Sequence, residues 1–257
     1  MPRHKRPHAA SPAPTIVYGA NPVLELLAAA PESVEQLWVA AEADAARVRA
    51  AAAEAGITVE QADRPTLDRL SGGGHHQGVA VRTRPFAYAE LEDILDAGAP
   101  LLIALDGITD PQNLGAIARS AEVLGAGGLV LPRDRSAAIT PAVVRASAGA
   151  TAHLPIAQVV NLVRALESAK GRGYWTVALT LDGSSTFQQL PELEHALLVI
   201  GSEGKGARPL VLEACDFRVR IPQAGRVGSL NASVAAAIGL YALADRMRRD
   251  GRKARPR

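Results

Sequence analysis

The sequence contains a single cysteine and no long apolar run. Cys215 is the only cysteine among 257 residues, which excludes a disulfide framework and is typical of a reducing cytoplasm. No stretch reaches the ~18 apolar residues that span a bilayer, and the first 14 residues lack the apolar core of a signal peptide. We therefore expect a cytoplasmic protein with no membrane partner. Cys215 lies in an apolar helical pattern, which predicts a buried structural thiol rather than a nucleophile.

The usual metal and nucleotide signatures are also absent. The six histidines show no ligand spacing with cysteine or carboxylates, so the sequence predicts no metal. No GxGxxG motif follows a predicted strand, and the glycine-rich segment 201–206 lacks the spacing of a phosphate-binding P-loop. These absences argue against an ordinary dinucleotide-binding or P-loop enzyme.

The net charge of +2 conceals an uneven distribution. Residues 1–7 and 246–257 hold 10 of the 28 Lys and Arg residues but only one of the 26 acids, which leaves 18 basic against 25 acidic residues between them. Basic ends on an acidic body suit a salt-sensitive grip on a polyanion. Disordered ends that merely solubilise the chain explain the same pattern.

Apolar strands alternate with helical patterns along the whole chain. We predict strands at 15–18, 34–39, 57–60 and 79–83, and helices from Asn21, at 42–55 and at 66–70. Further strands are predicted at 101–105, 128–131, 154–156, 175–180, 196–200 and 217–221, and helices at 113–125, 140–149 and 159–171. The pattern predicts a small α/β domain over 15–85, a linker over 86–99 and a mostly parallel-sheet α/β domain over 100–249. Tails at 1–14 and 250–257 flank these domains.

Polar loops follow several of the predicted strands. The glycine-rich loop 201–206 follows the apolar strand 196–200, and loop 222–228 follows strand 217–221. Residues 229–231 then precede a long helix of small residues. Because loops at the carboxyl ends of parallel strands bind ligands in open α/β sheets, we predict a ligand site here.

Two further segments carry polar residues whose role the residues alone leave open. Asn113 follows strand 101–105 and either caps the next helix or contacts a ligand, and Arg119 is either a surface charge or a group that reaches back to the same strand end. Loop 71–78, with three glycines, two histidines and a glutamine, is either an RNA-contacting loop or a plain connection.

At these residues the sequence resembles the SpoU, or TrmH-type, family of RNA ribose 2′-O-methyltransferases. Three motifs occur in the family's order over about residues 101–245: LDGITDPQNLGAIARSAEVLGAGGLVL, LVIGSEGKG and IPQAGRVGSLNASVAAAI. The N-terminal segments YGANPVLELL and HHQGVAVRTRP resemble the RNA-binding domain of the subgroup that modifies large-subunit rRNA. Within that subgroup, the chain is most similar to the enzyme that methylates a guanosine in the peptidyl-transferase P loop of 23S rRNA.

The resemblance implies a fold, a cofactor and an assembly. It implies a trefoil knot of the SPOUT type in the C-terminal domain, a ribosomal-protein L30e-like N-terminal domain, a homodimer and S-adenosylmethionine as cofactor. The small-residue helix over 232–244 is then partly a dimer interface. The residues implied in cofactor binding are Leu179, Thr180, Leu181, Gly201, Ile221, Ser229 and Leu230.

The resemblance also implies the reaction, in which a ribose 2′-hydroxyl attacks the sulfonium methyl group. The residues implied in catalysis are Arg119, Asn113, Glu203, Ser229 and Asn231. The family's proposed base corresponds to Arg119, but a guanidinium with a pKa above ~12 suits phosphate binding and alkoxide stabilisation better. Glu203 is expected to orient Arg119 by a charge-assisted hydrogen bond.

Two other functions fit the same motifs. One is the same chemistry on tRNA or on another rRNA nucleotide, including an antibiotic-resistance site. The other is a catalytically silent RNA-binding or ribosome-assembly protein.

Overall fold

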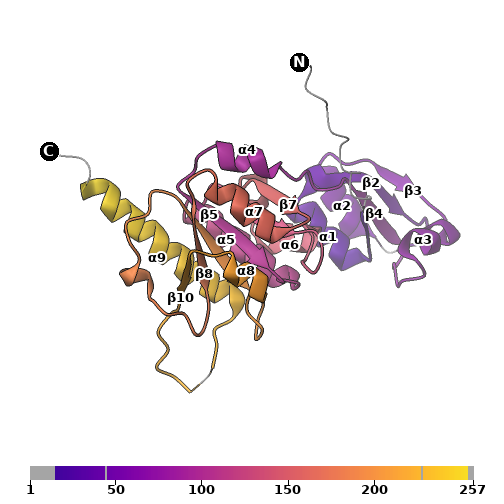
Figure 1. Ribbon diagram of the computed structural model, residues 1–257. Coiled ribbons are helices and arrows are strands. Elements are labelled where there is room, and N and C mark those ends of the chain that lie inside the picture. The colour runs from indigo at the N-terminus through magenta and orange to yellow at the C-terminus, as the bar shows by residue number, and fades with distance from the viewer. Residues whose placement is uncertain (1–14, 44, 227, 254–257) are drawn as a thin grey trace, which may run out of the picture. The chain divides into compact units, whose positions relative to one another are not determined.

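The computed structural model describes residues 15–43, 45–226 and 228–253, and the chain divides into two compact units, residues 1–87 and 88–257 (Figure 1). The predicted tail over 1–14 and residues 254–257 of the second tail lie outside the described residues. Residues 250–253 do not belong to a tail, because they continue the last helix, α9 (Ala232–Lys253).

The first unit is a four-stranded mixed sheet with three helices. Its strands are β1 (Thr15–Tyr18), β2 (Val34–Val39), β3 (Val59–Gln61) and β4 (Val79–Thr83), in the order β1-β4-β2-β3. Only β2 and β3 pair in parallel, and β4 runs antiparallel to both of its neighbours. The helices are α1 (Ala20–Ala29), α2 (Ala46–Glu54) and α3 (Arg64–Ser71), with a short 3-10 turn over Pro31–Ser33. This agrees with the predicted small α/β domain.

Loop 71–78 is tied to the first unit by its own side chains. Helix α1 begins at Ala20, not after a cap at Asn21, because the Ala20 N–H donates to Gln77 Oε1 at 3.0 Å. His76 is buried; its Nδ1 accepts from the Gly78 N–H and its Nε2 lies 3.0 Å from Asp68 Oδ1. His76 and Gln77 therefore make structural contacts, which favours the plain-connection interpretation of this loop.

The second unit contains a six-stranded sheet in which every pairing is parallel. Its strands are β5 (Leu101–Asp106), β6 (Leu129–Pro132), β7 (Ile156–Val159), β8 (Trp175–Leu179), β9 (Ala196–Gly201) and β10 (Phe217–Val219). The strand order is β10-β8-β9-β5-β6-β7. The predicted parallel α/β domain is confirmed at this level, and its central strands are buried on both faces, as their unbroken apolar sequences require.

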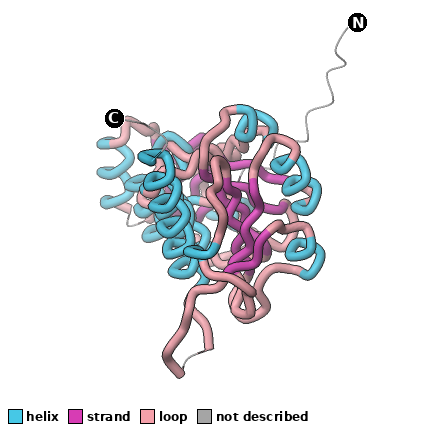
Figure 2. Tube along the Cα trace, turned by 60° about the vertical axis from the view of Figure 1, so that its left-hand side comes forward, coloured by secondary structure: helices cyan, strands magenta, loops and turns pink. Residues whose placement is uncertain are grey.

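Helices cover both faces of this sheet (Figure 2). One face packs against α4 (Leu91–Asp96), α7 (Leu162–Lys170) and α8 (Pro209–Glu213), whose buried residues share a core with β5 and β9. The other helices are α5 (Pro111–Val123), α6 (Pro141–Ala146) and α9, and α9 packs against α5, β5 and β9. Short 3-10 turns occur at Ala150–Ala152 and Phe187–Gln189.

The predicted linker over 86–99 belongs largely to the second unit. The division falls between Ala87 and Tyr88. Beyond it, Ala89 bridges to Ala157, and Ile94 and Leu95 of α4 are buried in the core of the second unit. Residues 88–99 therefore belong to the second unit, because Ile94 and Leu95 give α4 an apolar face that packs into its core.

Two element ends differ from the predictions for identifiable reasons. Helix α5 begins at Pro111 and is capped by Asp110, whose Oδ1 accepts from the Gln112 N–H at 3.1 Å, so Asn113 lies within the first turn. Strand β10 ends at Val219, because the Arg220 N–H donates to the Ser185 carbonyl and the chain leaves the edge of β8.

Among the residues that the structure describes, no helix combines the length and apolar character needed to cross a bilayer.

Candidate active site

The carboxyl ends of four parallel strands, β5, β8, β9 and β10, lie next to one another at one end of the large sheet. Asp106 at the end of β5 pairs with Gly201 at the end of β9, and Leu179 of β8 pairs with Ile200. The Thr180 N–H, just beyond β8, donates to the Val219 carbonyl of β10 at 2.9 Å. The loops that follow these strands therefore lie together, as the predicted parallel sheet requires.

The loop after β9 folds into a tight hairpin. The backbones of Ser202 and Gly206 exchange two hydrogen bonds, of 3.1 and 2.9 Å. Gly201 lies directly beneath this hairpin, since a Cβ there would be 1.9 Å from the Ala207 nitrogen. Gly204 adopts a positive φ of 75° at the tip, a conformation that glycine adopts without steric cost. The hairpin thus depends on glycine for close approach and for its turn.

A pocket lies between this hairpin, the loop after β8, the loop after β10 and the start of α9. All seven residues implied in cofactor binding line it: Leu179, Thr180, Leu181, Gly201, Ile221, Ser229 and Leu230. Eight others complete the lining: Ile200, Ser202, Glu203, Gly204, Gly206, Gln223, Ala232 and Ala235. Most of the missed residues belong to the two loops that the sequence singled out, so their position after strand ends was the available signal.

The lining of the pocket includes a buried polar group without a hydrogen-bond partner and two exposed apolar side chains. Thr180 Oγ1 is buried and has no hydrogen-bond partner among the described residues. Leu181 is 60% exposed and Leu230 38% exposed, although both are large apolar side chains. A buried hydroxyl without a partner and exposed leucines are each unfavourable in a closed fold. A ligand with an apolar ring and polar edges fits this lining.

A hydrogen-bonded cluster of three side chains stands at the rim of the pocket. Glu203 Oε1 accepts from Asn113 Nδ2 at 2.9 Å and from Asn231 Nδ2 at 2.6 Å. Asn231 Nδ2 also lies 3.0 Å from Asn113 Oδ1. The three residues come from three segments of the chain, and the structure brings them together.

The same cluster is joined to the start of helix α9. Asn231 Oδ1 accepts from the N–H groups of Ser233 and Val234 at 2.9 and 3.4 Å, which caps the helix. The Ala232 N–H lies 3.4 Å from Glu203 Oε1. A carboxylate next to a helix N-terminus is favoured by the helix dipole. The cluster therefore fixes α9 relative to the hairpin.

Arg119 lies apart from this cluster. It is exposed on α5 and makes no hydrogen bond or ion pair with any described residue. The expected bond between Glu203 and Arg119 is wrong in this single chain, because Glu203 is bonded to Asn113 and Asn231 instead. Six residues along a helix turn by roughly 240° and rise by about 9 Å, so Arg119 and Asn113 occupy different faces of α5.

Ser229, the remaining residue implied in catalysis, lines the pocket.

The remaining reactive groups lie outside the pocket. Burial raises the pKa of the Cys215 thiol to about 11, and its Sγ–H donates to the Val211 carbonyl at 3.1 Å. Cys215 is partly buried, follows α8 and is a structural thiol. Residues 15–43, 45–226 and 228–253 contain no group of three or more His, Cys, Asp or Glu residues that could hold a metal ion.

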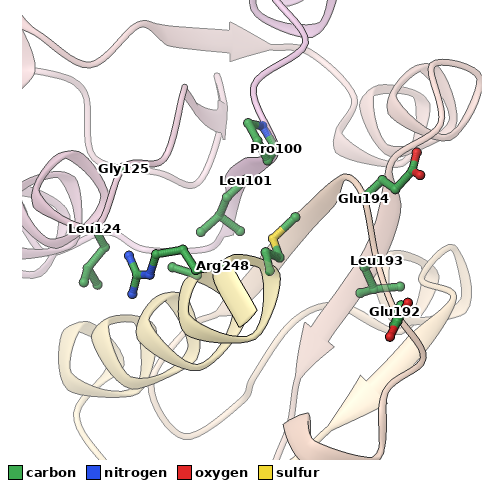
Figure 3. Close-up of a pocket in the computed structure, with 10 residues that line it drawn as sticks. Pro100, Leu101, Leu124, Gly125, Glu192, Leu193, Glu194 and Arg248 are labelled. Carbon is green, nitrogen blue, oxygen red and sulfur yellow. The ribbon is translucent and has the colours of Figure 1, made fainter. Parts of the chain in front are cut away.

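A second cavity of about 570 Å³ lies at the opposite edge of the sheet, where β5 begins (Figure 3). Leu101 and Leu193 lie in its apolar part, and Glu192, Glu194 and Arg248 bring charges to it. None of the residues predicted for the site lines this cavity. The residues predicted to bind the cofactor line the pocket at the carboxyl ends of the strands instead.

Comparisons with known proteins match the two units to two family models. Residues 100–241 match the SpoU rRNA Methylase family. Residues 16–89 match the family described as RNA 2′-O ribose methyltransferase substrate binding. These two matches coincide with the two structural units.

Named relatives and solved structures agree with these matches. The chain is 41% identical over 233 residues to a putative TrmH family tRNA/rRNA methyltransferase of Bacillus subtilis, covering 88% of this chain and 93% of that protein. It is 43% identical over 241 residues to an uncharacterized tRNA/rRNA methyltransferase of Mycolicibacterium gilvum, covering 91% of this chain and 77% of that protein.

Among solved structures, the SpoU methyltransferase AviRb of Streptomyces viridochromogenes, crystallised with the cofactor AdoMet, is 25% identical with a TM-score of 0.67. The match covers 94% of this chain and 92% of that one. An AdoMet-bound rRNA methyltransferase of Sinorhizobium meliloti is 26% identical with a TM-score of 0.60, over 90% and 86% of the two chains. By the family match and these identities, this chain is a member of the SpoU family of RNA methyltransferases.

Proposed function

We propose that this protein transfers the methyl group of S-adenosylmethionine to a ribose 2′-hydroxyl in RNA, with a guanosine in the P loop of 23S rRNA as the target. The observation that carries the proposal is the pocket at the strand ends. All seven residues expected to bind the cofactor line that pocket, and Glu203, Asn113 and Asn231 form a bonded cluster at its rim.

The pocket suits S-adenosylmethionine in its chemistry. The apolar side chains Leu181, Ile221 and Leu230 suit the adenine ring, and Thr180 Oγ1 is available to a polar group of the ligand. Backbone N–H groups of the glycine-rich hairpin supply further donors. When bound, the cofactor supplies a methyl group on a positively charged sulfur that a hydroxyl oxygen can attack.

The protein's own residues orient the RNA and stabilise charge. Asn113, Asn231 and Ser229 position the ribose and the loops, and Glu203 holds the two amides in place. Arg119, exposed and without a partner among the described residues, binds the phosphate next to the target and stabilises charge on the attacking oxygen. An arginine side chain is a poor candidate for a base, because its guanidinium group stays protonated in proteins.

The target within RNA rests on the N-terminal unit. Residues 16–89 match the substrate-binding family, and the first unit has its own four-stranded sheet. These observations support the proposal of a separate L30e-like RNA-binding domain. Specific recognition of 23S rRNA is assigned to this unit. tRNA or a different rRNA nucleotide is the alternative target, and the relatives' names include both RNA classes.

A homodimer is part of the proposal. Helix α9 exposes Val234, Ile238 and Tyr241, by 46%, 39% and 56%. These residues are four and three positions apart and so form one apolar stripe on the helix. Because an exposed apolar stripe on a helix is a recurrent protein contact, we assign it to the interface with a second copy. We also assign the protein to the cytoplasm.

The trefoil knot is proposed from the course of the chain around β10. Segment 180–186 crosses the end of β10, where a Cβ at Gly183 would be 2.4 Å from the Val219 carbonyl carbon. The Arg220 N–H then bonds Ser185, and Arg220 Nη1 donates to the Gly183 carbonyl at 2.7 Å. After this close passage the chain returns as α9 to pack on β5 and β9. This course supports a C-terminal segment threaded beneath the loop after β8.

The test of the proposed function is a methyl-transfer assay with two matched variants. Asn231→Ala removes the cap of α9 and a partner of Glu203, whereas Asn161→Ala removes a comparable cap at α7, where Asn161 Oδ1 accepts from the Arg164 N–H. We expect Asn231→Ala to lower transfer to RNA at least tenfold and Asn161→Ala to leave it within twofold. Equal activity of both variants would contradict the assignment of the cluster.

A further inference from the structure

An ion pair between a buried aspartate and a half-exposed arginine lies beside the hairpin that lines the pocket. Asp106, the last residue of β5, has a side chain only 2% exposed. Its Oδ1 accepts a hydrogen bond from Arg208 Nε at 2.8 Å and forms an ion pair with Arg208 Nη2 at 2.7 Å. Its Oδ2 accepts from the Arg208 backbone N–H at 2.7 Å. One residue thus supplies two hydrogen bonds and an ion-pair contact to a carboxylate that has almost no access to water.

This ion pair closes the two ends of the hairpin that follows β9. Asp106 pairs in register with Gly201, where the hairpin begins, and Arg208 stands two residues after Gly206, where it ends. Arg208 is also the residue before α8. Gly107, the residue after Asp106, also lies close to the hairpin, since a Cβ at this position would be 3.4 Å from the Ser202 Cβ. The hairpin cannot move away from β5 without breaking these two hydrogen bonds and the ion pair.

The hairpin contributes residues both to the lining of the pocket and to the cluster of Glu203, Asn113 and Asn231. Gly201, Ser202, Gly204 and Gly206 line the pocket. Glu203 at its tip holds Asn113 and Asn231. Neither Asp106 nor Arg208 lines the pocket. Their effect on the site therefore passes through the backbone of the hairpin.

We propose that Asp106 and Arg208 form a latch that fixes the hairpin over the cofactor pocket and holds Glu203 beside its two amides. Both are positioning residues. The expected effect of the latch on RNA methylation rests on the proposed function. The expected effect on cofactor binding rests on the shape of the pocket. Buried carboxylates need their partners, so loss of either side of the latch leaves the hairpin free to move.

The test compares the latch with an ion pair elsewhere in the same unit. Asp106→Asn removes the charge from the buried carboxylate, and Arg208→Lys is the milder second variant because it keeps the charge and the backbone N–H. The matched control is Asp96→Asn, which breaks the pair between Arg172 Nε and Asp96 Oδ1 at 2.6 Å. The full-length variants are compared for unfolding temperature and for the Kd of S-adenosylmethionine by calorimetry.

A second measurement separates positioning from general stability. The kcat for RNA methylation is measured for Asp106→Asn, for Glu203→Gln and for the double variant. If Asp106 acts through Glu203, the two substitutions are not additive. Asp106→Asn then lowers kcat about tenfold in the wild-type protein and by less than about threefold in the Glu203→Gln background.

The expected result is a Kd raised at least about fivefold in Asp106→Asn and unchanged in Asp96→Asn, with an intermediate value for Arg208→Lys. A smaller rise in Asp106→Asn, or additive effects on kcat, overturns the latch. If Asp106→Asn does not fold, a Kd for Arg208→Lys equal to that of the wild type overturns it. If the wild-type protein binds the cofactor but methylates no RNA, the proposed function fails, and the comparison of Kd values still decides the latch.

Discussion

Replacing Gly201 with alanine tests the shape of the pocket at one methyl group. A Cβ at this position would lie 1.9 Å from the Ala207 nitrogen and 2.1 Å from the Gly206 carbonyl carbon. Real Cβ contacts essentially never fall below 3.0 Å, so the hairpin backbone must move by about 1 Å. The φ angle of Gly201 is not in the left-handed region, so the effect is one of space alone.

The magnitude follows from the backbone atoms that must move. Overpacking of this kind costs about 1–3 kcal/mol, and Asp106 and Arg208 oppose the movement. Taking about 2 kcal/mol, we expect the unfolding temperature of the second unit to fall by about 4–8 °C. If ligand binding must restore the original hairpin, the same energy raises the Kd of S-adenosylmethionine about 30-fold.

The assay is calorimetric titration of S-adenosylmethionine into Gly201→Ala and into a matched glycine variant. Gly225→Ala is the control, because it lies in the loop before the pocket residues Ser229 and Leu230, and a Cβ there meets nothing within 4 Å. We expect the control to bind within about twofold of the wild type. A Kd for Gly201→Ala within about threefold of the wild type would refute the reasoning.

Three further predictions concern separate parts of the second unit. Arg119→Ala is expected to abolish methylation and leave the Kd of S-adenosylmethionine unchanged, since Arg119 does not line the pocket; unchanged turnover would remove its assigned role. Ile238→Glu is expected to yield monomers in sedimentation, because it places a charge in the exposed stripe of α9, whereas Val160→Glu, at a residue 71% exposed, leaves the dimer intact. Cys215, whose pKa burial raises to about 11, is expected to react with maleimide at pH 7.5 far more slowly in the folded than in the unfolded protein. Its native rate rises as the pH approaches that value; equal rates in both states would contradict its burial.

The fold of the second unit was predictable because its pattern is repetitive. Continuous apolar strands such as 101–105 and 196–200 alternate with helices, and a sheet buried on both faces requires this pattern. The errors fall where local signals compete. Asp110 and Asn113 are both residue types that cap helices. Asp110 is the cap in the structure, and Pro111 suits the first helical position that follows it. The composition shift and the flanking prolines predict a linker over 86–99, but they do not show that Ile94 and Leu95 of α4 are buried in the second unit.

The loops that meet at the ends of the strands were predictable from the sequence, but the hydrogen bonds among their side chains were not. Position after strand ends singled out the loops, and the resemblance added Glu203, Asn113 and Asn231. The partners of Glu203 depend on how three distant segments meet, which no local pattern encodes. Asp106 and Arg208 are 102 residues apart, and each looked like an ordinary residue at the end of a strand or before a helix. Their pairing is visible only when the sheet places β5 beside β9.

The central claim is most directly tested by methyl transfer from labelled S-adenosylmethionine to unmodified 23S rRNA and, separately, to unmodified tRNA. The position of each 2′-O-methyl group is then mapped. We predict label on the ribose of a guanosine in the P loop of 23S rRNA, and none on tRNA. Label on tRNA alone would contradict the proposed target. Absence of label on both RNAs, with the cofactor bound, would contradict the proposed activity.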